Sequence, residues 1–97
     1  MDINKALKTA VTTGKVLFGY EQTMKAVSTK SAKLIIISQN CPNEHLTQLE
    51  KQKDIPFYRF SGTNIELGSA CGKPFSVSML SVLSAGESEI LALGTNK

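Results

Sequence analysis

The chain has 97 residues, of which 41% are hydrophobic and 20% are charged, and this balance is typical of a single globular domain. A chain of this length buries roughly two-thirds of its unfolded surface, so it needs neither disulfides nor metals to form a core. No apolar run reaches the roughly 18 residues of a membrane span, and the N-terminal sequence MDINKALK is too polar for a signal peptide. We therefore expect one cytoplasmic domain over residues 1–97, without a membrane partner.

The net charge of +3 is unevenly distributed along the chain. Residues 1–33 carry six lysines against Asp2 and Glu21, a net charge of +4, and residues 34–97 carry a net charge of −1. A basic N-terminal third permits binding to a polyanion, although a solvated surface is the commoner explanation of charge alone. Cys41 and Cys71 have no CxxC spacing, and only His45 could join them at a zinc ion, so we expect structural thiols and no metal or other cofactor.

The N-terminal segment predicts a helix, a strand and a second helix. Apolar residues recur at helical spacing between Ile3 and Val11, with Asp2 placed to cap the helix and Thr12-Thr13-Gly14 to end it. A short apolar strand over residues 16–19 follows, and the next helix spans residues 20–29. Gly19 is therefore expected at a strand-to-helix junction, where backbone N–H groups can approach a ligand closely.

The stretch LIIISQNCP at residues 34–42 is the most informative in the chain. Four consecutive apolar residues predict a strand that is covered on both faces and is therefore central in its sheet. Ligands tend to bind at the carboxyl ends of such strands, and Asn40 lies there. A third helix is expected over residues 43–53 and a third strand over residues 57–60.

The C-terminal third predicts a short helix, a strand and a final helix. Thr63 and Glu66 have the spacing of a capping box, and Gly72 fits a left-handed helix end. Alternation of apolar and serine residues predicts a fourth strand over residues 75–79. A second capping box at residues 84–87 predicts a final helix that closes at Gly94. Helices and strands that alternate in this way predict an α/β fold, a three-layer α/β/α sandwich.

The sequence offers little for catalysis. The single histidine, His45, is expected on a helix surface, and no carboxylate is placed beside it. The phosphate-loop patterns GxxxxGK[ST] and GxGxxG are both absent. We therefore expect a protein that is not an enzyme, with no catalytic residues.

What remains is a set of polar and aromatic groups at element junctions. An asparagine side chain offers a donor and an acceptor to base edges, helix N-termini suit phosphates, and an aromatic ring can stack on an unpaired base. Asn40, the Gly19 junction and Phe75 supply these groups, although a capping asparagine or a core phenylalanine explains each one alone.

Five segments of the chain form a recognisable set: GYEQTMK at residues 19–25, KLIII at 33–37, NCP at 40–42, ELGSACGK at 66–73 and AGES at 85–88. Together they resemble the L30e family of large-subunit ribosomal proteins. The resemblance covers nearly the whole chain, and the short ends suit an archaeal member. The sister L7Ae type reads GxNExxK at the first of these segments and fits less well.

The resemblance implies a four-stranded mixed sheet and binding to a kink-turn, an RNA helix bent sharply at an internal loop with tandem sheared G·A pairs. It implies that the Gly19 junction approaches the bent backbone, that Asn40 bonds a guanine, and that the loop from Phe75 packs on an extruded base. The RNA-binding residues implied in this way are Phe18, Gly19, Tyr20, Glu21, Gln22, Lys25, Asn40, Phe75, Ser76 and Val77.

The chain departs from the family pattern at Glu21 and Ser76, because the family often has basic residues there. Each change removes a cation from the implied RNA face. The resemblance also implies ribosomal RNA and other large-subunit proteins as partners, and a monomer when isolated. Two alternatives stay open: a kink-turn module outside the ribosome, including a regulator of its own messenger RNA, and, from another class, a small nucleotide-binding or enzymatic α/β protein.

Overall fold

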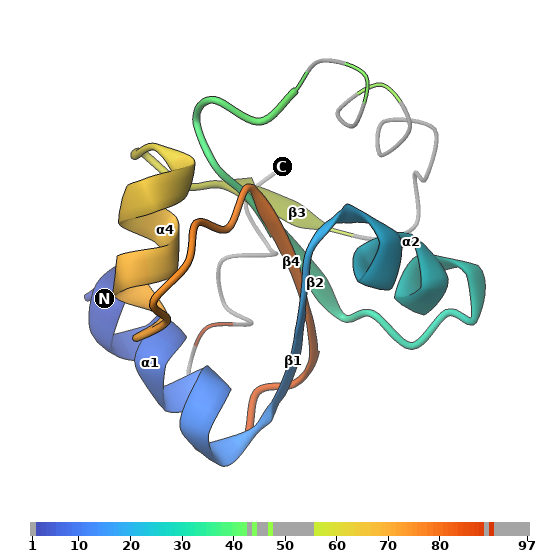
Figure 1. Ribbon diagram of the computed structural model, residues 1–97. Helices are drawn as coiled ribbons and strands as arrows, with labels where there is room; N and C mark the ends of the chain where they lie inside the picture. Colours follow the sequence, from blue (N-terminus) through green and yellow to red (C-terminus); the bar gives the residue numbers. More distant parts are fainter. Residues whose placement is uncertain (1, 43, 45–46, 48–55, 89, 91–97) are drawn as a thin grey trace.

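The computed structural model describes residues 2–42, 44, 47, 56–88 and 90 (Figure 1). A four-stranded mixed sheet has the order β1-β4-β2-β3. The strands are β1 (Lys15–Phe18), β2 (Leu34–Ile37), β3 (Phe57–Arg59) and β4 (Met79–Ser84). Strand β4 pairs antiparallel with β1 and β2, and β2 pairs parallel with β3.

Helices α1 (Ile3–Thr13) and α4 (Asn64–Ala70) cover one face of this sheet, and α2 (Tyr20–Ser28) covers the other (Figure 1). Strand β2 shows why two covers are needed, because all four of its residues are buried. Leu34 and Ile36 pack with α1 and α4, and Ile35 and Ile37 pack with α2. The central position predicted for this strand and the three-layer α/β/α sandwich are both confirmed.

The ends of α1 and α4 follow the predicted capping chemistry. The Asp2 carboxylate accepts hydrogen bonds from the N–H groups of Asn4 and Lys5, at 3.1 and 3.3 Å. Thr63 and Glu66 form the predicted capping box at the start of α4. Gly72, with φ of 76°, follows the end of α4 in the left-handed conformation that was expected of it.

The fourth strand begins later than the sequence pattern suggested. Strand β4 starts at Met79, and the predicted strand residues before it form a loop. In this loop the Val77 N–H bonds the Asn64 carbonyl at 2.9 Å, outside the sheet ladder. Residues 79–82 are all buried, so the true central strand lacks the alternation that indicated a strand over residues 75–79.

The cap predicted for the last helix is also wrong. Ser84 is the last residue of β4, and Gly86 makes a turn with φ of 60°. It is the Ser88 hydroxyl that accepts the Ile90 N–H, at 3.0 Å. Beyond Ile90 the predicted final helix lies outside the described residues, as does the helix predicted over residues 43–53 except for Glu44 and Thr47. Among the described helices, none is long and apolar enough to cross a membrane.

Candidate nucleic-acid interface

Three segments meet at one edge of the sheet. Strand β1 ends at Phe18, which pairs with Leu80, and β2 ends at Ile37, which pairs with Met79. The carboxyl ends of β1 and β2 therefore lie on either side of the start of β4. This brings together the β1–α2 junction, the segment after β2 and the loop between α4 and β4.

Backbone hydrogen bonds connect the α4–β4 loop and the start of β4 to the other two segments. The Gly19 N–H donates to the Met79 carbonyl at 2.8 Å, and the Ser38 N–H donates to the Ser78 carbonyl at 2.9 Å. The α4–β4 loop is thus held between the junction and the end of β2. We define the junction edge as the surface formed where the segments at residues 18–25, 38–40, 64 and 73–76 meet.

Gly19 has a backbone conformation that essentially only glycine adopts. Its φ of 97° and ψ of 161° lie outside the regions open to other residues. A Cβ placed on Gly19 would have no heavy atom within 4 Å, so the space in front of this residue is open. Gly19 caps α2 without a side chain, and the exposed Glu21 and Gln22 present first-turn N–H groups that have no intrahelical acceptor.

An aromatic pair with a cation lies beside this junction. The rings of Phe18 and Phe75 meet edge to face, with centroids 6.1 Å apart and an interplanar angle of 86°. The Lys73 ammonium lies 5.3 Å from the centroid of the Phe18 ring, within the range of a cation–π interaction. Phe75 is 52% exposed, so much of its ring is available to a ligand. Lys73 was not among the site residues predicted from the sequence, although its position two residues before Phe75 was a signal for it.

Helix α4 positions the backbone of the loop that carries Phe75. A Cβ on Gly68 would lie 2.0 Å from the Phe75 carbonyl oxygen, so the loop backbone rests directly on the helix at this point. No larger residue fits at Gly68 unless the loop moves. The aromatic pair is therefore positioned by close backbone packing as well as by its own contact.

Asn40 is exposed, and its side chain is tied to two neighbours. Its amide oxygen accepts the Asn64 N–H at 2.8 Å and the Ser38 hydroxyl at 3.0 Å, and its amide nitrogen donates to Asn64 Oδ1 at 3.1 Å. Asn64 is 24 residues away in the chain and was not among the site residues predicted from the sequence.

The other predicted site residues differ in exposure. Lys25 and Ser76 are exposed, whereas Tyr20 is partly buried against the core on the α2 face. Val77 is only 2% exposed and belongs to the core on the α1 and α4 face. Among the loop residues, the side chains of Phe75 and Ser76 are therefore accessible from solvent, whereas the Val77 side chain packs in the core.

The described residues offer no constellation for catalysis. No group of three or more potential metal ligands occurs among them. Cys41 and Cys71 are both buried free thiols. Burial raises the pKa of Cys71 to about 11, with Lys73 opposing the shift, and burial raises the pKa of Cys41 as well, opposed by Arg59. Neither thiol is thus a thiolate nucleophile at neutral pH.

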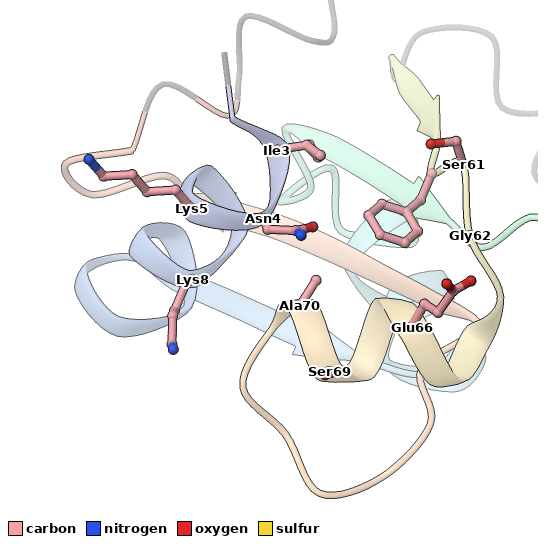
Figure 2. Close-up of a pocket in the computed structure, with 10 residues that line it drawn as sticks. Ile3, Asn4, Lys5, Lys8, Ser61, Gly62, Glu66, Ser69 and Ala70 are labelled. Carbon is pink, nitrogen blue, oxygen red and sulfur yellow. The ribbon is translucent and has the colours of Figure 1, made fainter.

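A hollow of about 700 Å³ lies between α1, α4 and the turn at residues 60–62, where Figure 2 shows its lining. The Glu66 carboxylate on its wall accepts the Thr63 N–H at 2.8 Å as part of the capping box. Lys5 and Lys8 extend from α1 away from the hollow (Figure 2). Its polar groups do not converge on a common point, so the junction edge is the better candidate site.

Comparison with known proteins gives a consistent result. Residues 1–92 match the model of the "Ribosomal protein L7Ae/L30e/S12e/Gadd45 family". A protein of Methanosphaerula palustris is 41% identical over 93 residues, which cover 96% of this chain and 97% of the relative. A protein of Methanocaldococcus jannaschii is 43% identical over 100 residues, which cover 100% of this chain and 91% of the relative. Both are named large ribosomal subunit protein eL30, so these relatives are ribosomal proteins and not enzymes.

A solved structure shares the fold along the whole chain. It is a protein with unknown function from Bacillus halodurans, with a TM-score of 0.82 and 27% sequence identity. The match covers 99% of this chain and 98% of that protein.

Proposed function

The chain belongs to the ribosomal protein L7Ae/L30e/S12e/Gadd45 family, and from this we propose that it is a structural protein of the large ribosomal subunit that binds kink-turn RNA. The names of its archaeal relatives support the ribosomal role. The proposal places the protein on the cytoplasmic ribosome, with ribosomal RNA and other large-subunit proteins as partners and as a monomer when isolated.

The convergence of three segments at the junction edge carries this proposal. Regular A-form RNA hides its base edges in a narrow groove, and a sharp bend exposes them together with unstacked bases. A protein that reads such a bend needs a close backbone approach, a polar reader and an apolar platform within one surface. Gly19, Asn40 and Phe75 lie on a single edge, and the proposal gives these three roles to them.

The proposal assigns a contact to each of these groups. The open space in front of Gly19 admits an RNA backbone, and the N–H groups of the first turn of α2 point toward it. Lys25, one turn further along α2, and Lys73, beside the aromatic pair, supply positive charge. Phe75 stacks on an extruded base with Phe18 behind it.

Glu21 and Ser76 modify the affinity in this proposal. Both are exposed at the junction edge, where a cation would contact phosphates. Each phosphate contact that is missing lowers the salt dependence of binding by about one unit of slope. We therefore expect recognition that depends more on shape and less on charge than in a relative with basic residues at both positions.

A direct titration tests the proposal. The protein is titrated with a short RNA that carries a kink-turn and with a straight duplex of equal length, at two salt concentrations. The expected result is tighter binding to the kink-turn at both concentrations. Equal binding to both RNAs with a steep salt dependence would contradict it, because such binding needs only a basic surface.

A further inference from the structure

The orientation of the Asn40 amide is determined by its neighbours. The Asn64 backbone N–H lies 2.8 Å from one terminal atom of the Asn40 side chain. A backbone N–H can only donate, so this terminal atom is the amide oxygen and not the nitrogen. The Ser38 hydroxyl, 3.0 Å from the same oxygen, occupies its second lone pair.

The amide nitrogen keeps one hydrogen for a ligand. One of its two N–H groups donates to Asn64 Oδ1 at 3.1 Å. Among the described residues, nothing accepts the second N–H, and Asn40 is exposed. Asn40 therefore presents a donor to the junction edge, while its acceptor is already in use.

We propose that Asn64 is a positioning residue that makes Asn40 a donor-only reader, so that the guanine which the family resemblance assigns to Asn40 is contacted through one of its acceptors, O6 or N7. The inference rests on the proposed function, and it names the group by which the same site distinguishes bases. Guanine carries acceptors at O6 and N7, whereas adenine carries a donor amino group where guanine has O6. A sheared G·A pair uses the N2 and N3 edge of guanine, so O6 and N7 remain open to the protein.

A freely rotating asparagine would not discriminate in this way. An unrestrained amide can turn its oxygen toward an adenine amino group or its nitrogen toward guanine O6. Asn64 removes this choice because its N–H and its Oδ1 hold both ends of the Asn40 amide. An N–H of Asn40 that faces an adenine amino group meets a second donor, which leaves both unpaired and weakens binding.

Asn64 is itself held firmly, as a positioning residue must be. It is the first residue of α4, and it lies directly after the N-cap Thr63, inside the capping box that Thr63 forms with Glu66. Its carbonyl accepts the Val77 N–H at 2.9 Å, and the Gln39 N–H donates to the Gly62 carbonyl at 2.7 Å. The segment after β2 and the start of α4 are therefore joined by backbone as well as side-chain hydrogen bonds.

A double-mutant cycle on the full chain tests the proposal. The probe is a kink-turn RNA with tandem sheared G·A pairs, and the variants are Asn40→Ala, Asn64→Ala and the double mutant. Asn40→Ala should weaken binding by about 5- to 100-fold, the range for a good base contact. Asn64→Ala should weaken it by about two- to tenfold, the effect of leaving one side chain to be ordered on binding. The double mutant should bind like Asn40→Ala alone.

Modified RNA identifies the acceptor. Replacement of the guanine by 2-aminopurine removes O6, and replacement by 7-deazaguanine removes N7. One of these should weaken binding to the wild-type protein and have no further effect on Asn40→Ala. Losses from Asn40→Ala and Asn64→Ala that multiply in the double mutant would overturn the proposal, as would wild-type affinity in Asn64→Ala.

Two further measurements separate positioning from folding. Ser69→Ala, at an exposed site on the same helix, should keep wild-type affinity. In the RNA-free protein, the two side-chain N–H signals of Asn40 in an NMR spectrum should be well separated, and in Asn64→Ala they should move toward values of an exposed amide. Unchanged signals would overturn the positioning role. If the wild type itself binds kink-turn and duplex equally, the proposed function fails too, whereas a kink-turn preference with a multiplicative cycle refutes the Asn64 proposal alone.

Discussion

Substitution of Gly19 by alanine separates backbone strain from steric clash. Residues other than glycine in the region of φ 97° and ψ 161° pay roughly 1–3 kcal/mol in strain. Alanine also restricts the unfolded chain, which stabilises the protein by about 0.4–1 kcal/mol. No clash adds to these effects, because a Cβ on Gly19 has nothing within 4 Å. The net loss in the free energy of unfolding should therefore be about 0.5–2 kcal/mol.

Urea denaturation of Gly19→Ala and wild type measures this loss. For a domain of this size, each kcal/mol lowers the melting temperature by about 4–8 °C, so the expected decrease is about 2–16 °C. The matched control is Gly72→Asn, because the left-handed conformation at the end of α4, with φ of 76°, admits asparagine. A Gly19→Ala variant as stable as the wild type, or less affected than Gly72→Asn, would refute the strain assigned to the junction.

Three further predictions concern other parts of the molecule. Phe75→Ala should weaken kink-turn binding by about 1–3 kcal/mol, the contribution of one base stacked on an aromatic ring. Its effect on the free energy of unfolding should be smaller, because the ring is 52% exposed. Equal affinity of variant and wild type in a titration would remove Phe75 from the site. Thr23→Val should raise the free energy of unfolding, measured in urea, by about 1 kcal/mol, because the buried Thr23 hydroxyl has no hydrogen-bond partner among the described residues. A decrease of the same size in the free energy of unfolding would contradict this and would reveal a buried water bonded to the hydroxyl. The pKa of the Cys71 thiol is raised from 9.0 to about 11 in the folded protein, so the unfolded chain loses this proton first as the pH rises. The free energy of unfolding should therefore fall between pH 9 and 11, by up to about 1.4 kcal/mol per pH unit. Cys71→Ala should lack this decrease, and identical pH profiles of variant and wild type would contradict the prediction.

The parts of the fold that local chemistry determines could be predicted from the sequence. The run LIII predicted a strand buried on both faces because only a covered strand tolerates apolar residues at successive positions. The capping box of Thr63 and Glu66 and the left-handed Gly72 were predictable because each depends on neighbours within a few residues.

Strand β4 was predicted at the wrong residues because its sequence matches neither the alternation of a half-buried strand nor the continuous apolar run of a fully buried one. Residues 75–79 alternate as a half-buried strand does, yet they form the loop that carries Phe75. The true strand, MLSVLS, contains Ser81 at a fully buried position, which breaks the apolar run expected of a central strand. Sequence pattern alone could not decide between the two segments.

The sequence indicated which segments form the candidate site, but not which of their residues contact one another. Gly19, Asn40 and Phe75 were identified as junction residues, and the structure brings them to one edge. The Asn40–Asn64 pair and the approach of Lys73 to Phe18 depend on how α4 and its loop pack against the sheet. Such contacts join residues far apart in the chain, so no local pattern indicates them.

Amide chemical shifts of the labelled protein, followed during titration with a kink-turn RNA, test the central claim most directly. The account predicts that the largest changes occur at the junction edge, at residues 18–25, 38–40, 64 and 73–76. Residues 30–33 and 84–88, at the opposite ends of β2 and β4, should change little. Changes that center on those distant residues, or that spread evenly over the lysines, would contradict a site built from Gly19, Asn40 and Phe75.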